Sequence, residues 1–122
     1  MNRLNALAVG ALLSLGLVTQ AFAHAHLQTA VPMPDGDVSA APDALRLKFS
    51  EGLELAFTGV TLNASDASAV PLGPATLAAG DDTTLVVPVT RRLAAGKYAV
   101  SWHALSKDGH KTHGDYTFTV KQ

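Results

Sequence analysis

The residues of this chain best suited to chemistry are its histidines, which fall at two distant places in the sequence. They are His24 and His26 near the start, and His103, His110 and His113 near the end. Asp108 precedes His110 by two residues, within a polar stretch between two apolar, alternating runs. Imidazole nitrogens and carboxylate oxygens bind divalent transition metals, so metal binding is the first chemistry to consider.

The first 23 residues have the features of a secretory signal peptide. Arg3 supplies a positive start, residues 6–18 form an apolar run, and Ala21-Phe22-Ala23 is a small-x-small cleavage site. The apolar run is shorter than the roughly 20 residues that span a bilayer, so we expect no stable membrane insertion after cleavage. The predicted organisation is a cleaved signal peptide over residues 1–23 and one domain over residues 24–122.

Composition limits what the exported domain can do. Loss of Arg3 leaves 8 Lys and Arg against 10 Asp and Glu, with no basic cluster, so nucleic acid and anionic membranes are poor partners. The chain has no Cys, so no disulfide can stabilise it. A domain of about 100 residues can instead be held by a hydrophobic core.

The elements that position the histidines are predicted to be strands. Apolar residues alternate with polar ones, and Gly, Pro, Asp and Asn fall at the breaks, the pattern of half-buried strands. The clearest predicted strands lie at residues 27–31, 45–49, 60–62, 85–89, 97–104 and 114–121. About seven short strands in one domain favour an all-β sandwich. Pro88 predicts a sheet edge for its strand, and Trp102 is predicted to lie in the core.

Cleavage before His24 would give this histidine a free α-amine. The amine and the imidazole Nδ1 of His24 can then chelate one metal ion in a single ring. Adding His110 and Asp108 makes three nitrogens and one oxygen, a planar ligand set that suits Cu(II). Asp108 and His110 are two residues apart, so both side chains point the same way in an extended segment, and Gly109 lets the backbone bend.

The spacing also leaves other interpretations open. A free His24-Ala25-His26 end can bind Cu(II) through its amine, two deprotonated amides and the His26 imidazole, without any fold. His26 is otherwise an outer or axial ligand, or a plain surface residue. Histidines in solvated loops also often bind nothing.

Three further residues are candidates for supporting or alternative roles. His103 either orients the site or is simply exposed, and His113 is expected to be a solvated or outer residue. Glu51 could accept a hydrogen bond from a ligating imidazole, as carboxylates beside metal sites do. Met33 is the only methionine after residue 23, which excludes a thioether-rich Cu(I) site.

Several segments together resemble the CopC copper-resistance proteins, and their YobA-like branch most closely. They are His24-Ala25-His26-Leu27, Pro34-x-Gly36, Leu47-Lys48-Phe49-Ser50-Glu51, Trp102-His103-Ala104-Leu105-Ser106-x-Asp108-Gly109-His110 and Gly114-x-Tyr116-x-Phe118. The resemblance implies a periplasmic, Ig-like Greek-key sandwich that binds Cu(II). The family's N-terminal histidine falls on His24, its D-x-H pair on Asp108 and His110, and its acidic position on Glu51. Residues 61–74 hold no Met or His, so the Cu(I) site of some members is expected to be absent.

The leading functional hypothesis is a copper-binding protein and not an enzyme. It would carry or buffer periplasmic Cu(II) for copper homeostasis and resistance, and the family implies delivery to a CopD-like inner-membrane importer. The alternative is a copper monooxygenase with a histidine brace, which also uses an N-terminal histidine. Against it, the domain is small, the whole chain has only seven aromatic residues, and Asp108 would occupy the position where O2 binds. A third interpretation is an exported sandwich that meets copper only incidentally.

Overall fold

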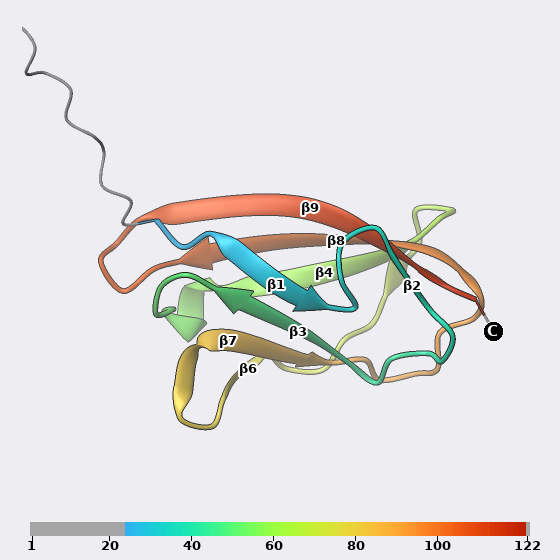
Figure 1. The fold of residues 1–122 in the computed structure, drawn as a ribbon, viewed down its shortest axis with the longest axis horizontal. Coiled ribbons are helices and arrows are strands. Elements are labelled where there is room, and N and C mark those ends of the chain that lie inside the picture. The colour runs from blue at the N-terminus through green and yellow to red at the C-terminus, as the bar shows by residue number, and fades with distance from the viewer. Residues whose placement is uncertain (1–23, 122) are drawn as a thin grey trace, which may run out of the picture.

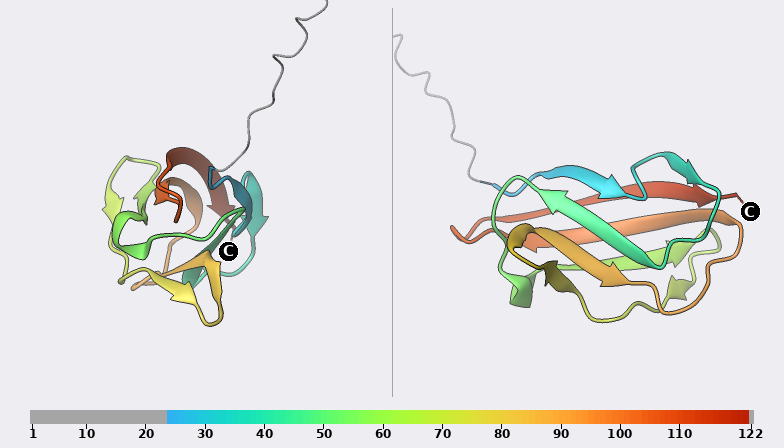
Figure 2. Two further views of the ribbon diagram at one scale, coloured as in Figure 1. Left: turned by 90° about the vertical axis from the view of Figure 1, so that its left-hand side faces the viewer. Right: turned by 60° about the horizontal axis from the view of Figure 1, so that its bottom comes forward.

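The computed structural model describes residues 24–121 as two β-sheets packed face to face (Figures 1 and 2). The predicted signal peptide lies outside the described residues. The four-stranded sheet has the order β1 (Leu27–Val31), β3 (Ala44–Phe49), β7 (Asp81–Pro88) and β6 (Thr76–Ala78). The five-stranded sheet has the order β2 (Gly36–Val38), β9 (Lys111–Val120), β8 (Gly96–Leu105), β4 (Gly59–Ala64) and β5 (Ala69–Val70).

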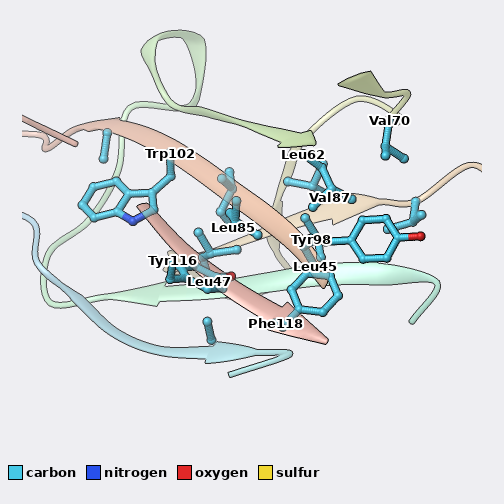
Figure 3. Packing of buried hydrophobic residues seen from close by; sticks show 14 of the residues in the cluster. Leu45, Leu47, Leu62, Val70, Leu85, Val87, Tyr98, Trp102, Tyr116 and Phe118 are labelled. Carbon is cyan, nitrogen blue, oxygen red and sulfur yellow. The ribbon is translucent and has the colours of Figure 1, made fainter. Parts of the chain in front are cut away.

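Alternation of apolar and polar residues produces this fold, because successive side chains of a strand point to opposite faces. In β3, Leu45, Leu47 and Phe49 are buried while the residues between them are exposed. In β8, Tyr98 and Trp102 lie on the buried face. Figure 3 shows side chains of the two sheets interleaved in one core. Trp102 lies there against Phe49, with their rings edge-on and 5.0 Å apart, so its predicted core role is confirmed.

The predicted β-sandwich is confirmed, with differences in detail. Three strands of only two or three residues, β2, β5 and β6, join the longer ones. The predicted edge position for the strand of Pro88 is wrong, because β7 lies between β3 and β6. Pairing of β6 with β7 ends at Val86, so Pro88, the last residue of β7, needs no N–H for that ladder. The last strand begins at Lys111, earlier than predicted.

One end of the sandwich brings the two histidine-bearing regions together. β8 and β9 form a long antiparallel hairpin, and the loop that joins them lies at the end where the described chain begins (Figures 1 and 2). The turn between β6 and β7 lies at the same end (Figure 1).

Among residues 24–121, no helix has the length and apolar character needed to cross a membrane. The short 3-10 helix η2 spans Leu55–Phe57.

Candidate metal centre

The first three described residues form an arm that is fixed between the two sheets. Ala25 is fully buried, whereas His24 and His26 are exposed. The Ser50 hydroxyl accepts the His26 amide N–H at 2.9 Å and donates to the His24 carbonyl at 3.2 Å. The Ser50 amide donates to the His26 carbonyl at 2.9 Å. On the other side, the Thr112 hydroxyl donates to the Ala25 carbonyl at 2.9 Å. The backbone of the arm is therefore held by Ser50, just after β3, and by Thr112 of β9.

The loop between β8 and β9 is a tight turn built around Ser106. The Ser106 amide donates to the His110 carbonyl at 3.0 Å, and the Gly109 amide donates to the Ser106 carbonyl at 2.9 Å. Gly109 has φ of 92°, a region that favours glycine, so its predicted bend is present. The Lys107 amide donates to the Gly52 carbonyl at 3.0 Å, which ties the loop to the neighbouring segment. The loop is thus a folded turn and not the extended segment that the spacing suggested.

These two anchored segments bring the predicted ligands together. The ring centroids of His24 and His110 are 4.5 Å apart, and those of His24 and His26 are 6.3 Å apart. Asp108 Oδ1 lies 3.1 Å from His110 Nδ1. Because metal–imidazole bonds are about 2.0–2.1 Å long, two rings on one ion have centroids about 4.5–6.5 Å apart. His24 is therefore within coordination reach of both His110 and His26.

The predicted ligands lie close together but do not surround one common point. Within residues 24–121, no three His, Asp or Glu side chains form a ready-made metal site. The reason is visible at Asp108, whose Oδ1 is hydrogen-bonded to both the Ser106 hydroxyl and His110 Nδ1. In this arrangement His110 has Nε2 free for a metal, and Asp108 orients the ring as carboxylates do beside metal-bound histidines. Direct coordination by Asp108 requires its bond to His110 to open.

The electrostatics of the loop favour a cation. The hydrogen bond from the Ser106 hydroxyl, followed by the interaction with His110, lowers the pKa of Asp108 below its ordinary value. The carboxylate is therefore ionised at neutral pH. The side chains of His110 and Asp108 are 49% and 42% exposed, so an ion can reach both from solvent.

The other predicted candidates, Glu51, His103 and His113, make no hydrogen bond with a predicted ligand among residues 24–121. Glu51 is half-buried, and within the described part of the chain no hydrogen bond joins it to an imidazole. His103 and His113 lie opposite each other on β8 and β9 and face solvent on the outer side of the sheet. Trp102 beside them faces the core, so their side of the hairpin is opposite to that of the arm. The structure therefore brings His26 close to His24, whereas His103 and His113 lie on the opposite side of the hairpin.

Sequence reasoning missed the residues that hold the site in shape. Ser50, Ser106 and Thr112 each use a hydroxyl to fix backbone beside a predicted ligand. The sequence did offer a signal for Ser106. It lies two residues before Asp108, the same spacing that separates Asp108 from His110. The contacts of Ser50 and Thr112 could not be predicted, because they depend on which strands pack together in the fold.

The fold and the site define a small all-β protein with an imidazole cluster at one end of its sandwich. Residues 27–121 match the CopC domain, and the chain belongs to the CopC family. It is 43% identical over 112 residues to Protein YobA of Escherichia coli strain K12, which covers 91% of this chain and 90% of that protein. It is also similar to Copper resistance protein C of Escherichia coli, with 37% identity over 115 residues, 89% of this chain and 90% of the relative.

A solved structure supports the same assignment. PcoC from Escherichia coli, described as a methionine-rich copper resistance protein, superposes with a TM-score of 0.73 and 36% identity. The match covers 81% of this chain and all of that one. Both the family resemblance and the β-sandwich predicted from the sequence are thereby confirmed.

Proposed function

We propose that this protein binds one Cu(II) ion in the periplasm and serves copper homeostasis or resistance. Its ligands are the α-amine and imidazole of His24, the imidazole of His110 and the carboxylate of Asp108. The observation that carries the proposal is the 4.5 Å approach of the His24 and His110 rings, which are 86 positions apart in the sequence. The names of the relatives, Copper resistance protein C and the copper resistance protein PcoC, support copper as the metal.

The donor set supports Cu(II) rather than Cu(I). Imidazole, amine and carboxylate donors suit Cu(II), whereas Cu(I) prefers thiolates and thioethers. Met33 is the only methionine after residue 23, and it lies in the segment between β1 and β2, 61% exposed. PcoC is by its description methionine-rich, so this chain differs from it in the donors available to Cu(I). His26 is a further nitrogen within reach of the same ion.

The role we propose is that of a carrier or buffer and not an enzyme. A charged carboxylate in the coordination plane stabilises Cu(II) and occupies a position that an oxygen-activating site leaves open. Among the large apolar side chains of the described residues, Phe57 is the one aromatic that is well exposed, at 63%, which offers little of a flat aromatic surface for a glycan. Delivery to a CopD-like inner-membrane protein completes the proposal.

The sharpest test uses the N-terminus itself. Protein that begins at His24 should bind one equivalent of Cu(II), with an electron paramagnetic resonance spectrum of three nitrogens and one oxygen. A matched protein with one extra alanine before His24 keeps every side chain but loses the amine–imidazole chelate. We expect its Cu(II) affinity, measured by competition titration, to fall at least 100-fold, because direct ligands matter at least as much as outer partners, whose loss costs about 10–100-fold. Equal affinities would refute the proposed chelate.

A further inference from the structure

A second pair of imidazoles lies on the outer face of the β8–β9 hairpin. His103 and His113 are direct partners in the antiparallel register. Trp102 and Ala104, on either side of His103, point into the core and are buried, so the His103 side chain points outward. Both histidines are exposed. The register, and not the sequence spacing, places these two rings on one surface.

The pairing is of the type that brings side chains closest. The Ser106 amide donates to the His110 carbonyl, so these two residues form a hydrogen-bonded pair. Pairs alternate along an antiparallel ladder, which makes His103 and His113 a non-hydrogen-bonded pair. Cβ atoms in directly opposed pairs are about 4.5–5.5 Å apart and are closest in this type. Two imidazoles from such positions can reach one ion through metal–nitrogen bonds of about 2.0–2.1 Å.

The fold does not use either ring. Within residues 24–121, neither imidazole makes a hydrogen bond or an ion pair with another protein group. The His103 ring lies over Gly59 of β4, where an added Cβ would be 3.0 Å from its Cε1. In this rotamer the ring leans toward β4, so sharing an ion with His113 requires it to rotate toward β9. Exposed side chains change rotamer within picoseconds to nanoseconds, so rotation toward His113 is readily accessible.

We propose that His103 and His113 form a second, weaker site for a divalent transition metal. Two imidazole nitrogens bind first-row ions in an order that peaks at Cu(II), so Cu(II) is the preferred occupant and Zn(II) binds less tightly. The charged residues nearest along β9 on the same face are Lys111 and Asp115, whose charges offset each other. With two protein donors in an exposed position, this site exchanges its ion more readily than the His24 centre would. It does not depend on the function proposed above.

A variant that removes the other three histidines isolates this pair. The chain has five histidines, so His24→Ala/His26→Ala/His110→Ala leaves His103 and His113 as the only imidazoles. The three replaced side chains are exposed, so the fold should persist, which a thermal melt checks. We expect CuCl2 to bind this variant with two nitrogens in its electron paramagnetic resonance spectrum and to raise its Tm, because the ion bridges β8 and β9 only in the folded state.

The pair is then broken one residue at a time. Adding His103→Ala or His113→Ala to the triple variant should each lower Cu(II) affinity at least 10-fold and abolish the rise in Tm. Thr117→Ala, on the same strand and face as His113, is the matched control and should change neither. If the triple variant binds no Cu(II), or if the fourth substitution leaves affinity within twofold, the second site does not exist. Neither result bears on the His24 centre, whose imidazoles are absent throughout.

Discussion

Two aspartates in neighbouring turns at one end of the sandwich show how alike a structural carboxylate and a candidate ligand can look. Asp81 begins β7, after the β6–β7 turn. It accepts hydrogen bonds from the Thr83 hydroxyl at 2.6 Å, the Thr83 amide at 3.0 Å and the Thr84 hydroxyl at 2.7 Å. Lys48 lies 3.6 Å away. The Asp81 carboxylate is therefore surrounded by hydrogen-bond donors from strands of the four-stranded sheet.

Asp108 in the β8–β9 loop has fewer and freer partners. One is the buried Ser106 hydroxyl, and the other is the exposed imidazole of His110. The pKa is lowered at both Asp108 and Asp81, so charge does not distinguish them. What differs is that one partner of Asp108 is an exposed imidazole, and a second imidazole, that of His24, lies 4.5 Å from it. A candidate ligand is therefore distinguished from a structural carboxylate by its exposed imidazole neighbours, not by its residue type.

The largest expected effect is a difference in Cu(II) affinity between variants of the β8–β9 loop and a variant of the β6–β7 turn. Asp108→Ala and His110→Ala should each weaken Cu(II) binding about 100-fold or more, because each removes a direct donor or the group that orients one. Asp81→Ala should leave affinity within twofold, because the partners of Asp81 are two hydroxyls, a backbone amide and a lysine, none of them a predicted ligand. Competition titration against a Cu(II) chelator measures all three.

His26→Ala is the control that separates the folded site from binding by the free N-terminal peptide. In the folded site its effect should be much smaller than that of His110→Ala. Binding by the amine, two amides and His26 alone gives the reverse order. A protein that loses Cu(II) on His26→Ala and keeps it on His110→Ala would contradict a site that joins the N-terminal arm to the β8–β9 loop.

Much of the fold could be predicted because the alternation of apolar and polar residues indicates which side chains of a strand are buried. The predicted strand 27–31 coincides with β1, Leu27–Val31, since its neighbours Pro32 and Met33 begin a turn. The short strands β2 and β5 could not be found this way, because two or three residues carry no period. Their pairing depends on which longer strand runs beside them.

The candidate site was predictable only in part. His24, Asp108 and His110 were recognised from ligand type and from the expected cleavage position, and the structure gathers them at one end. That His103 faces His113 could not be predicted, because it depends on the length of the Ser106–His110 turn and hence on the register of the hairpin. A shift of one residue would have placed His113 on the buried face.

The second prediction asks whether the arm is a fixed half of the site. Ser50→Ala and Thr112→Val remove the hydroxyls that hold the backbone of the arm beside His110. We expect each to lower Cu(II) affinity about 10-fold, the lower end of the range for partners that orient ligands. Thr61→Ala, an exposed threonine on β4, is the control and should have no effect. Unchanged affinity in both arm variants would mean that the ion itself positions His24.

The third prediction tests the structural role of Asp81 through acid stability. Its pKa is strongly lowered, first by the Thr83 hydroxyl and then by the Thr84 hydroxyl. A carboxyl with a lowered folded-state pKa stabilises the fold above its ordinary pKa of about 3.9, and this stabilisation is lost as pH falls below that value. Asp81→Asn should therefore lower the Tm by a few degrees at pH 7, and the gap to the original protein should narrow toward pH 2.

Thr83→Val provides the matched test, since it removes the largest cause of the lowered pKa and keeps the carboxylate. It should reproduce part of the loss in Tm at pH 7 and leave Cu(II) affinity unchanged. A gap between Asp81→Asn and the original protein that stays constant from pH 7 to pH 2 would show that the carboxylate is not the stabilising group.

The smallest expected effect concerns the ion pair that links the two turns. Lys107 Nζ lies 3.0 Å from Asp82 Oδ2, and this carboxylate raises the pKa of Lys107. Both side chains are about half exposed, and exposed pairs contribute little because water and salt screen them. The loop is held instead by backbone bonds, such as that from the Lys107 amide to the Gly52 carbonyl. We expect Lys107→Ala to change Cu(II) affinity by less than about threefold and to leave its dependence on NaCl nearly unaltered, both measured by titration at low and high salt. A tenfold loss that disappears in high salt would instead mean that charge in the Asp81–Asp82 turn sets the position of Asp108, and that the two turns act as one unit.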